Sequence, residues 1–167
     1  MRPLEKKRLL VVGIGNEAMK DDGLGVRLAR ELARRSWPEE IGVAILGSDP
    51  LDLLLMDGEA DCLVFLDAVS SGAPAGMVHR LDAEEAFPSG GAPTSLHHLG
   101  LRETLGLARA LGRNFSAVVL GVECEAIGPG WELTARLSAM LPDMVEAVTR
   151  EIMKIYRTIS VSPTTVC

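Results

Sequence analysis

The segment 9–25 changes from a strand pattern to a helix pattern around a pair of acidic residues. Its first part, 9–12, is an apolar run typical of a buried strand, and the glycines that follow permit a sharp turn. Asp21 and Asp22 come next, and after them apolar residues recur at helical spacing. Because sites in α/β folds form beyond the carboxyl ends of strands, this loop is the first candidate for chemistry.

Apolar runs alternate with helical patterns along the rest of the chain, which predicts an α/β fold with a mostly parallel sheet. Strands are expected at about 8–12, 43–46, 62–66, 76–81 and 115–122. Helices are expected at about 23–35, 51–56, 95–111 and 133–155, with Pro142 dividing the last one into two pieces. The weakly alternating strand 76–81 follows a short connection and is expected to be antiparallel. The predicted architecture is a three-layer αβα sandwich, a twisted sheet of about five strands with helices on both faces.

The length of 167 residues fits a single domain, 1–167, with a core over about 8–157 and a polar tail, 158–167, that is expected to fray. A net charge of −6 and an aromatic content of 4% argue against nucleic acid and anionic membranes as partners. The chain contains no apolar stretch of membrane-spanning length and no signal peptide, so a cytoplasmic location is expected. The three cysteines lie far apart in the sequence, which favours reduced thiols over a disulfide framework or a zinc site.

Acidic and histidine side chains follow the predicted strands at three places. Asp22 lies in the first loop, Asp67 directly after the strand 62–66, and His97 and His98 at the start of a helix. Since the carboxyl ends of parallel strands meet at one edge of the sheet, the two acids are expected to converge there. Two carboxylates with an imidazole form a partial site for a divalent metal, with positions left open for water or a substrate.

Simpler roles stay open for each of these groups. One acid of the Asp21–Asp22 pair is expected to cap the following helix while the other faces the cleft. Asp67 can equally form a turn, and one of the two histidines can be structural. Cys124, after the last strand, is a weaker candidate for a nucleophile because no histidine is expected near it.

The glycine turn also allows a nucleotide-binding interpretation. Gly13 and Gly15, with Ala18 at the third small position, partly match the dinucleotide fingerprint. However, the helical period begins only after Gly23, whereas a dinucleotide turn enters its helix at once. Two carboxylates at the mouth of the site would also repel phosphates, so this interpretation ranks low.

Taken in order, the motifs resemble those of the nickel–iron hydrogenase maturation endopeptidases. The first is Gly13-x-Gly15-Asn16-x-x-Met19-x-Asp21-Asp22-Gly23-x-Gly25. The others are Leu66-Asp67-Ala68, Ser95-Leu96-His97-His98-Leu99-Gly100-Leu101, and Leu120-Gly121-Val122-Glu123 followed by Gly130. The order and spacings agree from about residue 9 to residue 155, and the first motif is the most specific.

The resemblance implies a monomeric three-layer fold and a metal-dependent endopeptidase. Such enzymes remove the C-terminal extension of the hydrogenase large-subunit precursor after nickel insertion, and they carry no serine or cysteine nucleophile. By motif position, the residues implied to contact nickel, which arrives with the substrate, are Asp22, Asp67 and His97. Asp21, Asp49 and His98 are lesser candidates.

The chain departs from the family pattern after its second strand, where Gly47-Ser48-Asp49-Pro50 replaces the Gly-Gly-Thr or Gly-Gly-Ser of many members. The contacts of this loop with a substrate are therefore open. Two other functions remain as alternatives: a maturation chaperone that senses nickel without hydrolysis, and, ranked lower, a nucleotide-binding α/β protein.

Overall fold

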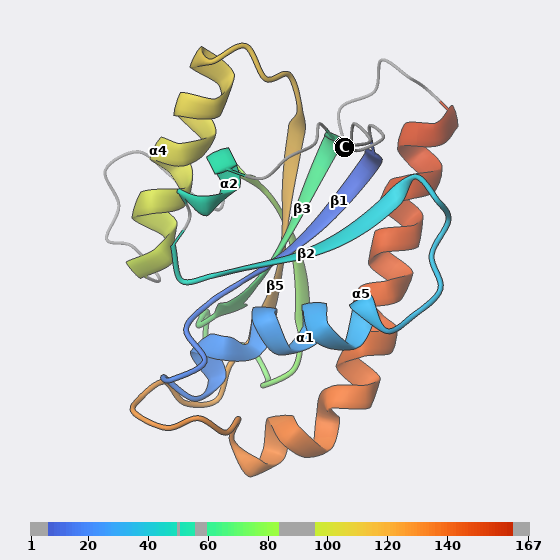
Figure 1. Ribbon diagram of the computed structural model, residues 1–167. Helices are drawn as coiled ribbons and strands as arrows, with labels where there is room; N and C mark the ends of the chain where they lie inside the picture. Colours follow the sequence, from blue (N-terminus) through green and yellow to red (C-terminus); the bar gives the residue numbers. More distant parts are fainter. Residues whose placement is uncertain (1–6, 50, 56–59, 84–95, 162–167) are drawn as a thin grey trace.

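A five-stranded sheet lies between two layers of helices in the computed structural model, which describes residues 7–49, 51–55, 60–83 and 96–161 (Figure 1). The strand order is β2-β1-β3-β5-β4. The strands are β1 (Lys7–Ile14), β2 (Ile41–Gly47), β3 (Ala60–Val69), β4 (Val78–Asp82) and β5 (Ser116–Glu123). All neighbouring strands pair in parallel except β4, which pairs antiparallel with β5. The predicted fold class is confirmed, including the antiparallel fourth strand.

The helices divide between the two faces of this sheet. They are the short 3₁₀ turn η1 (Asp21–Gly23), α1 (Leu24–Ala33), α2 (Asp52–Leu55), α4 (Leu96–Ala110) and α5 (Ala135–Val161). α1 and α5 share a hydrophobic core with one face, and α2 and α4 share a second core with the other. No helix in the described ranges has both the length and the apolar character needed to cross a membrane.

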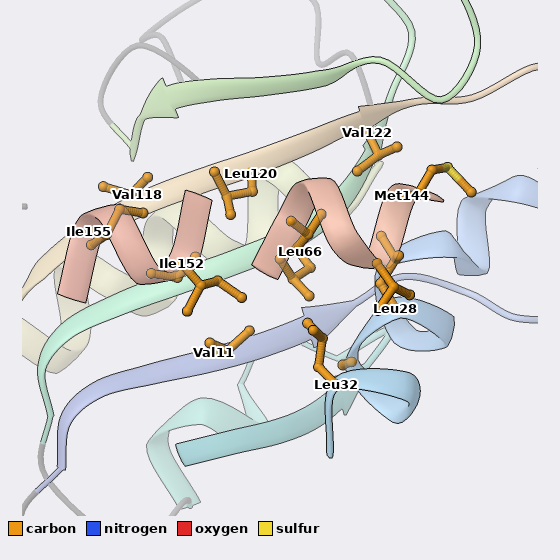
Figure 2. Close-up of a cluster of buried hydrophobic side chains, with 14 of the residues drawn as sticks. Val11, Leu28, Leu32, Leu66, Val118, Leu120, Val122, Met144, Ile152 and Ile155 are labelled. Atoms are coloured by element: carbon orange, nitrogen blue, oxygen red, sulfur yellow. The ribbon is translucent and has the colours of Figure 1, made fainter. Parts of the chain in front are cut away.

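The alternation of side chains along β5 shows how the sheet is buried on both faces. Val118, Leu120 and Val122 point into the core beneath α5, where Leu66 of β3 also lies (Figure 2). Val119, between them in sequence, belongs to the core beneath α4. Because both faces are covered, the central strands are apolar at nearly every position, as expected for a parallel sheet.

The start of α1 packs directly onto the backbone of two strands. A Cβ atom added to Gly25 would lie 2.1 Å from the carbonyl oxygen of Leu66 and 2.4 Å from that of Ile14. Only a residue without a side chain permits this approach. The close packing holds η1, immediately before α1, at the carboxyl ends of β1 and β3, where the candidate site was predicted.

The last helix differs from its prediction. α5 is one continuous helix of 27 residues that includes Pro142, so the expected division at this proline is wrong. A proline inside a helix costs about 3 kcal/mol, but buried apolar residues on both sides, including Leu137 and Met144, hold the helix to the sheet. The helix continues to Val161, so residues 158–161 are helical rather than frayed; residues 162–167 lie outside the described ranges.

The cysteines also differ in part from their prediction. Cys62, which is buried in β3, is disulfide-bonded, so the expectation of reduced thiols is wrong for this residue. Cys124 is a free thiol, as expected.

Candidate functional site

Asp22 lies in η1 and is 6% exposed. Its Oδ2 accepts a hydrogen bond of 3.1 Å from the backbone N–H of Asn16, which closes the turn after β1. The N-cap of α1 is Gly23, and no side chain caps this helix. The prediction that one of the two acids caps α1 is therefore wrong, because Asp22 accepts the Asn16 N–H and Asp21 accepts its bonds from the loop after β5.

Asp21 is completely buried and joins η1 to the loop that follows β5. Its carboxylate accepts hydrogen bonds from the backbone N–H groups of Glu125 (3.0 Å), Ala126 (2.9 Å) and Thr134 (2.8 Å), and from the Thr134 hydroxyl (3.1 Å). A carboxylate has about four acceptor positions. Four donors therefore occupy Asp21 in a structural role.

Asp67 is a completely buried residue inside β3, not a residue after it as predicted. The strand continues because β5 pairs with it as far as Val69 opposite Glu123. The pairing of β3 with β1 ends three residues earlier, at Leu66. The Asp67 Oδ1 accepts the N–H of Ala68 at 2.8 Å. Since η1 also contacts β3, Asp22 and Asp67 lie on neighbouring elements at the carboxyl edge of the sheet.

The other predicted ligands lie farther along the chain. The backbones of His97 and His98 form part of the first turn of α4, but their side chains lie outside the described residues. Asp49 is exposed after β2, and its Oδ1 accepts the N–H of Leu51 at 3.0 Å, an ordinary turn contact. Among the described residues, no three His, Cys, Asp or Glu side chains are grouped to hold a metal ion. A metal held by Asp22 and Asp67 would therefore need further donors from outside this set.

Glu123, at the end of β5, is a buried acid whose role the sequence did not indicate. Its carboxylate accepts hydrogen bonds from the Ser71 N–H (2.7 Å) and hydroxyl (2.8 Å) and from the Gly72 N–H (2.9 Å). The Nε2 atom of His79 in β4 lies 3.2 Å from the same carboxylate. Glu123 thus holds the loop between β3 and β4 beside the strand end that carries Asp67.

The pKa of Glu123 reflects this environment. Burial by itself raises the pKa of the carboxyl group, but the hydrogen bonds from Ser71, Gly72 and His79 outweigh burial. The net result is a pKa below the ordinary value of 4.5. The folded chain therefore favours the charged carboxylate.

Replacing Glu123 by glutamine is expected to make the stability of the fold less dependent on pH in the acidic range. Because the pKa is lower in the folded chain, the unfolded chain binds more protons between the folded pKa and 4.5. The carboxylate contributes its stability above this window and loses it as the pH falls through the folded pKa. Thermal unfolding between about pH 3 and pH 6 should decline more steeply for the unmodified chain than for Glu123→Gln. Equal slopes would contradict a lowered pKa of Glu123 in the folded chain.

Cys124 lies next to this cluster, but its environment does not suit a nucleophile. Burial raises the pKa of its thiol, and the negative charges of Asp21, Glu123 and Asp22 raise it further. The attacking form of cysteine is the thiolate, which these surroundings disfavour. The thiol therefore stays protonated, which agrees with the weak prediction of a nucleophile here.

The αβα fold and the two buried acids at the carboxyl edge of its sheet define an α/β protein with a candidate ligand site. A family model described as hydrogenase maturation protease matches residues 26–151. The chain belongs to this family.

Curated relatives show the same likeness. The chain is 31% identical over 147 residues to the hydrogenase 2 maturation protease of Escherichia coli, covering 84% of this chain and 88% of that protein. It is 40% identical over 107 residues to the hydrogenase expression/formation protein HupD of Thiocapsa roseopersicina, covering 62% of this chain. The chain spans about half the length of that HupD (48%) and 65% of HupD from Bradyrhizobium diazoefficiens.

Solved structures agree with these relatives in fold. The hydrogenase maturating endopeptidase HybD of E. coli superposes with a TM-score of 0.72 at 30% identity, covering 88% of this chain and 93% of that one. The [NiFe] hydrogenase maturation protease HybD of Thermococcus kodakarensis gives a TM-score of 0.69 at 29% identity, covering 87% and 99%.

Proposed function

We propose that this chain is an endopeptidase that removes the C-terminal extension from the large-subunit precursor of a nickel–iron hydrogenase, acting as a cytoplasmic monomer. Membership of the hydrogenase maturation protease family carries this proposal. It is supported by the relative from E. coli, which is named a hydrogenase 2 maturation protease and which the chain covers over most of its length.

The nickel of the precursor would be recognised by Asp22 and Asp67, with His97 as a third ligand. Carboxylates and imidazole are suitable donors for nickel, which in this proposal belongs to the substrate. Strand pairing with β5 holds the backbone of Asp67 in place for such a role. Asp22 adds a second negative charge from η1, which contacts the same strand.

In this proposal, cleavage depends on whether the precursor carries nickel. A divalent ion beside the susceptible bond can polarise its carbonyl group and lower the pKa of a bound water. A precursor without nickel would lack both the element that the two acids recognise and this chemistry. The protein would consequently distinguish nickel-loaded from nickel-free precursor before cleavage.

A cleavage assay tests this function directly. The purified chain is incubated with nickel-loaded and nickel-free precursor, and the masses of the products are measured. We expect a precursor shortened at its C-terminus only in the nickel-loaded sample. Binding of the loaded precursor without any shortened product would favour the chaperone function instead. A rise in melting temperature with NAD or ATP, but not with nickel, would favour nucleotide binding.

A further inference from the structure

The loop that follows β5 carries exposed apolar side chains in an uncharged segment, 126–131. Trp131 is 70% exposed and Ile127 is 48% exposed. The chain contains only two tryptophans, and the other, Trp37, is partly buried and donates its Nε1–H to the carbonyl of Leu32 at 2.8 Å. Trp131 therefore places a large apolar surface in water without a role in the core.

Hydrogen bonds tie this loop to the segment that precedes Asp22. The backbone N–H of Lys20 donates to the carbonyl of Gly130 at 2.7 Å, and the N–H of Gly130 donates to the carbonyl of Ala18 at 2.9 Å. The carbonyl of Trp131 accepts a bond of 2.8 Å from the Arg27 guanidinium. The buried carboxylate of Asp21 anchors both ends of the same loop, as described above. The exposed side chains are thus presented by a backbone that is already ordered.

The fixed backbone also makes the loop continuous with the candidate site. Its hydrogen bonds go to residues 18–21, and Asp22 is the next residue in the chain. A protein whose metal centre reaches Asp22 must therefore pass close to the segment 126–131. An aromatic side chain on a rigid support is the kind of residue that dominates the binding energy of protein interfaces, since little conformational entropy is lost on binding.

We infer that the segment 126–131, with Trp131 as its main contact, is the docking surface for an apolar part of the precursor beside its metal centre. This inference rests on the proposed function, because it names how the substrate of that same site is held. The absence of charge in the segment matches an apolar partner, and the exposed charged residues Lys20 and Glu132 lie next to it.

The two tryptophans permit a direct binding test. The chain is labelled with 5-fluorotryptophan, and its two fluorine NMR signals are assigned with a Trp37→Phe variant. Addition of unlabelled, nickel-loaded precursor is expected to shift the Trp131 signal and leave the Trp37 signal in place. An unmoved Trp131 signal in a sample in which the precursor is cleaved would overturn the inference and leave the proposed function standing. A shifted signal without cleavage would support docking while refuting the proposed function.

A kinetic test uses a matched pair of exposed apolar residues. Trp131→Ala is expected to raise the KM for the precursor roughly tenfold or more with little change in kcat, because the side chain contacts substrate away from the reacting bond. Leu111→Ala is the control, since Leu111 is 67% exposed and lies between α4 and the amino end of β5, at the opposite edge of the sheet. Unchanged KM in the Trp131 variant, or an equal rise in both variants, would contradict the inference.

Discussion

Asp67→Asn is expected to slow cleavage of a nickel-loaded precursor by more than about a hundredfold while the chain stays folded. Loss of a residue that only supports a metal ligand costs roughly 10- to 100-fold, and loss of the proposed ligand itself should cost more. Asparagine has nearly the same size and keeps an acceptor for the N–H of Ala68. It lacks the negative charge that attracts a divalent ion. Initial rates of precursor shortening, measured by mass spectrometry, give the result, and circular dichroism verifies the fold.

Asp61→Asn is the matched control for this variant. Asp61 lies on the same strand, but at its amino end, and it is exposed. The same chemical change there should leave the rate of cleavage unaltered. Similar rates for Asp67→Asn and the unmodified chain would remove Asp67 from the proposed site. A comparable loss in both variants would point to a general effect of charge.

Gly25→Ala is expected to destabilise the fold by about 3 kcal/mol or more, because overpacking against backbone atoms cannot be relieved by a change of rotamer. The added methyl group would lie 2.1 Å from the carbonyl oxygen of Leu66 and 2.4 Å from that of Ile14. Relief requires α1 to move away from β1 and β3, which would also displace η1 with Asp22. Urea unfolding measures the loss of stability.

Gly106→Ala provides the opposite case within a helix. A Cβ atom at Gly106, in α4, would meet nothing within 4 Å. Replacement of a glycine by alanine in an open helical position should stabilise the fold by about 0.5–1 kcal/mol. Equal losses of stability in the two variants would contradict the packing described for α1.

The sheet could be predicted because its signals are local in the sequence. The run 62–66 is apolar throughout, as burial on both faces requires, and the short connection before β4 indicates an antiparallel strand. The ends of β3 could not be predicted in the same way. Asp67 interrupts the apolar run, but pairing with β5 extends the strand past it to Val69. A polar residue within the strand thus conceals the true strand end.

The candidate site could be predicted only as far as topology allowed. Parallel strands bring Asp22 and Asp67 to one edge whatever the details of packing, so their common location was accessible from the sequence. The role of Asp21 was not, because most of its donors are backbone N–H groups, which every residue except proline carries. The contact between Glu123 and His79 likewise depends on the pairing of β4 with β5, which the sequence does not specify.

The hydrogen bonds of Asp21 have a consequence for the order in which the molecule is completed during synthesis. The donors lie 104 to 113 positions later in the chain. Asp21 therefore leaves the ribosome long before the residues that donate to it are synthesised. Until they arrive, the carboxylate must stay in water, since burying it alone would be unfavourable. The turn that carries Asp21 would accordingly be completed only after residues 125–134 have emerged.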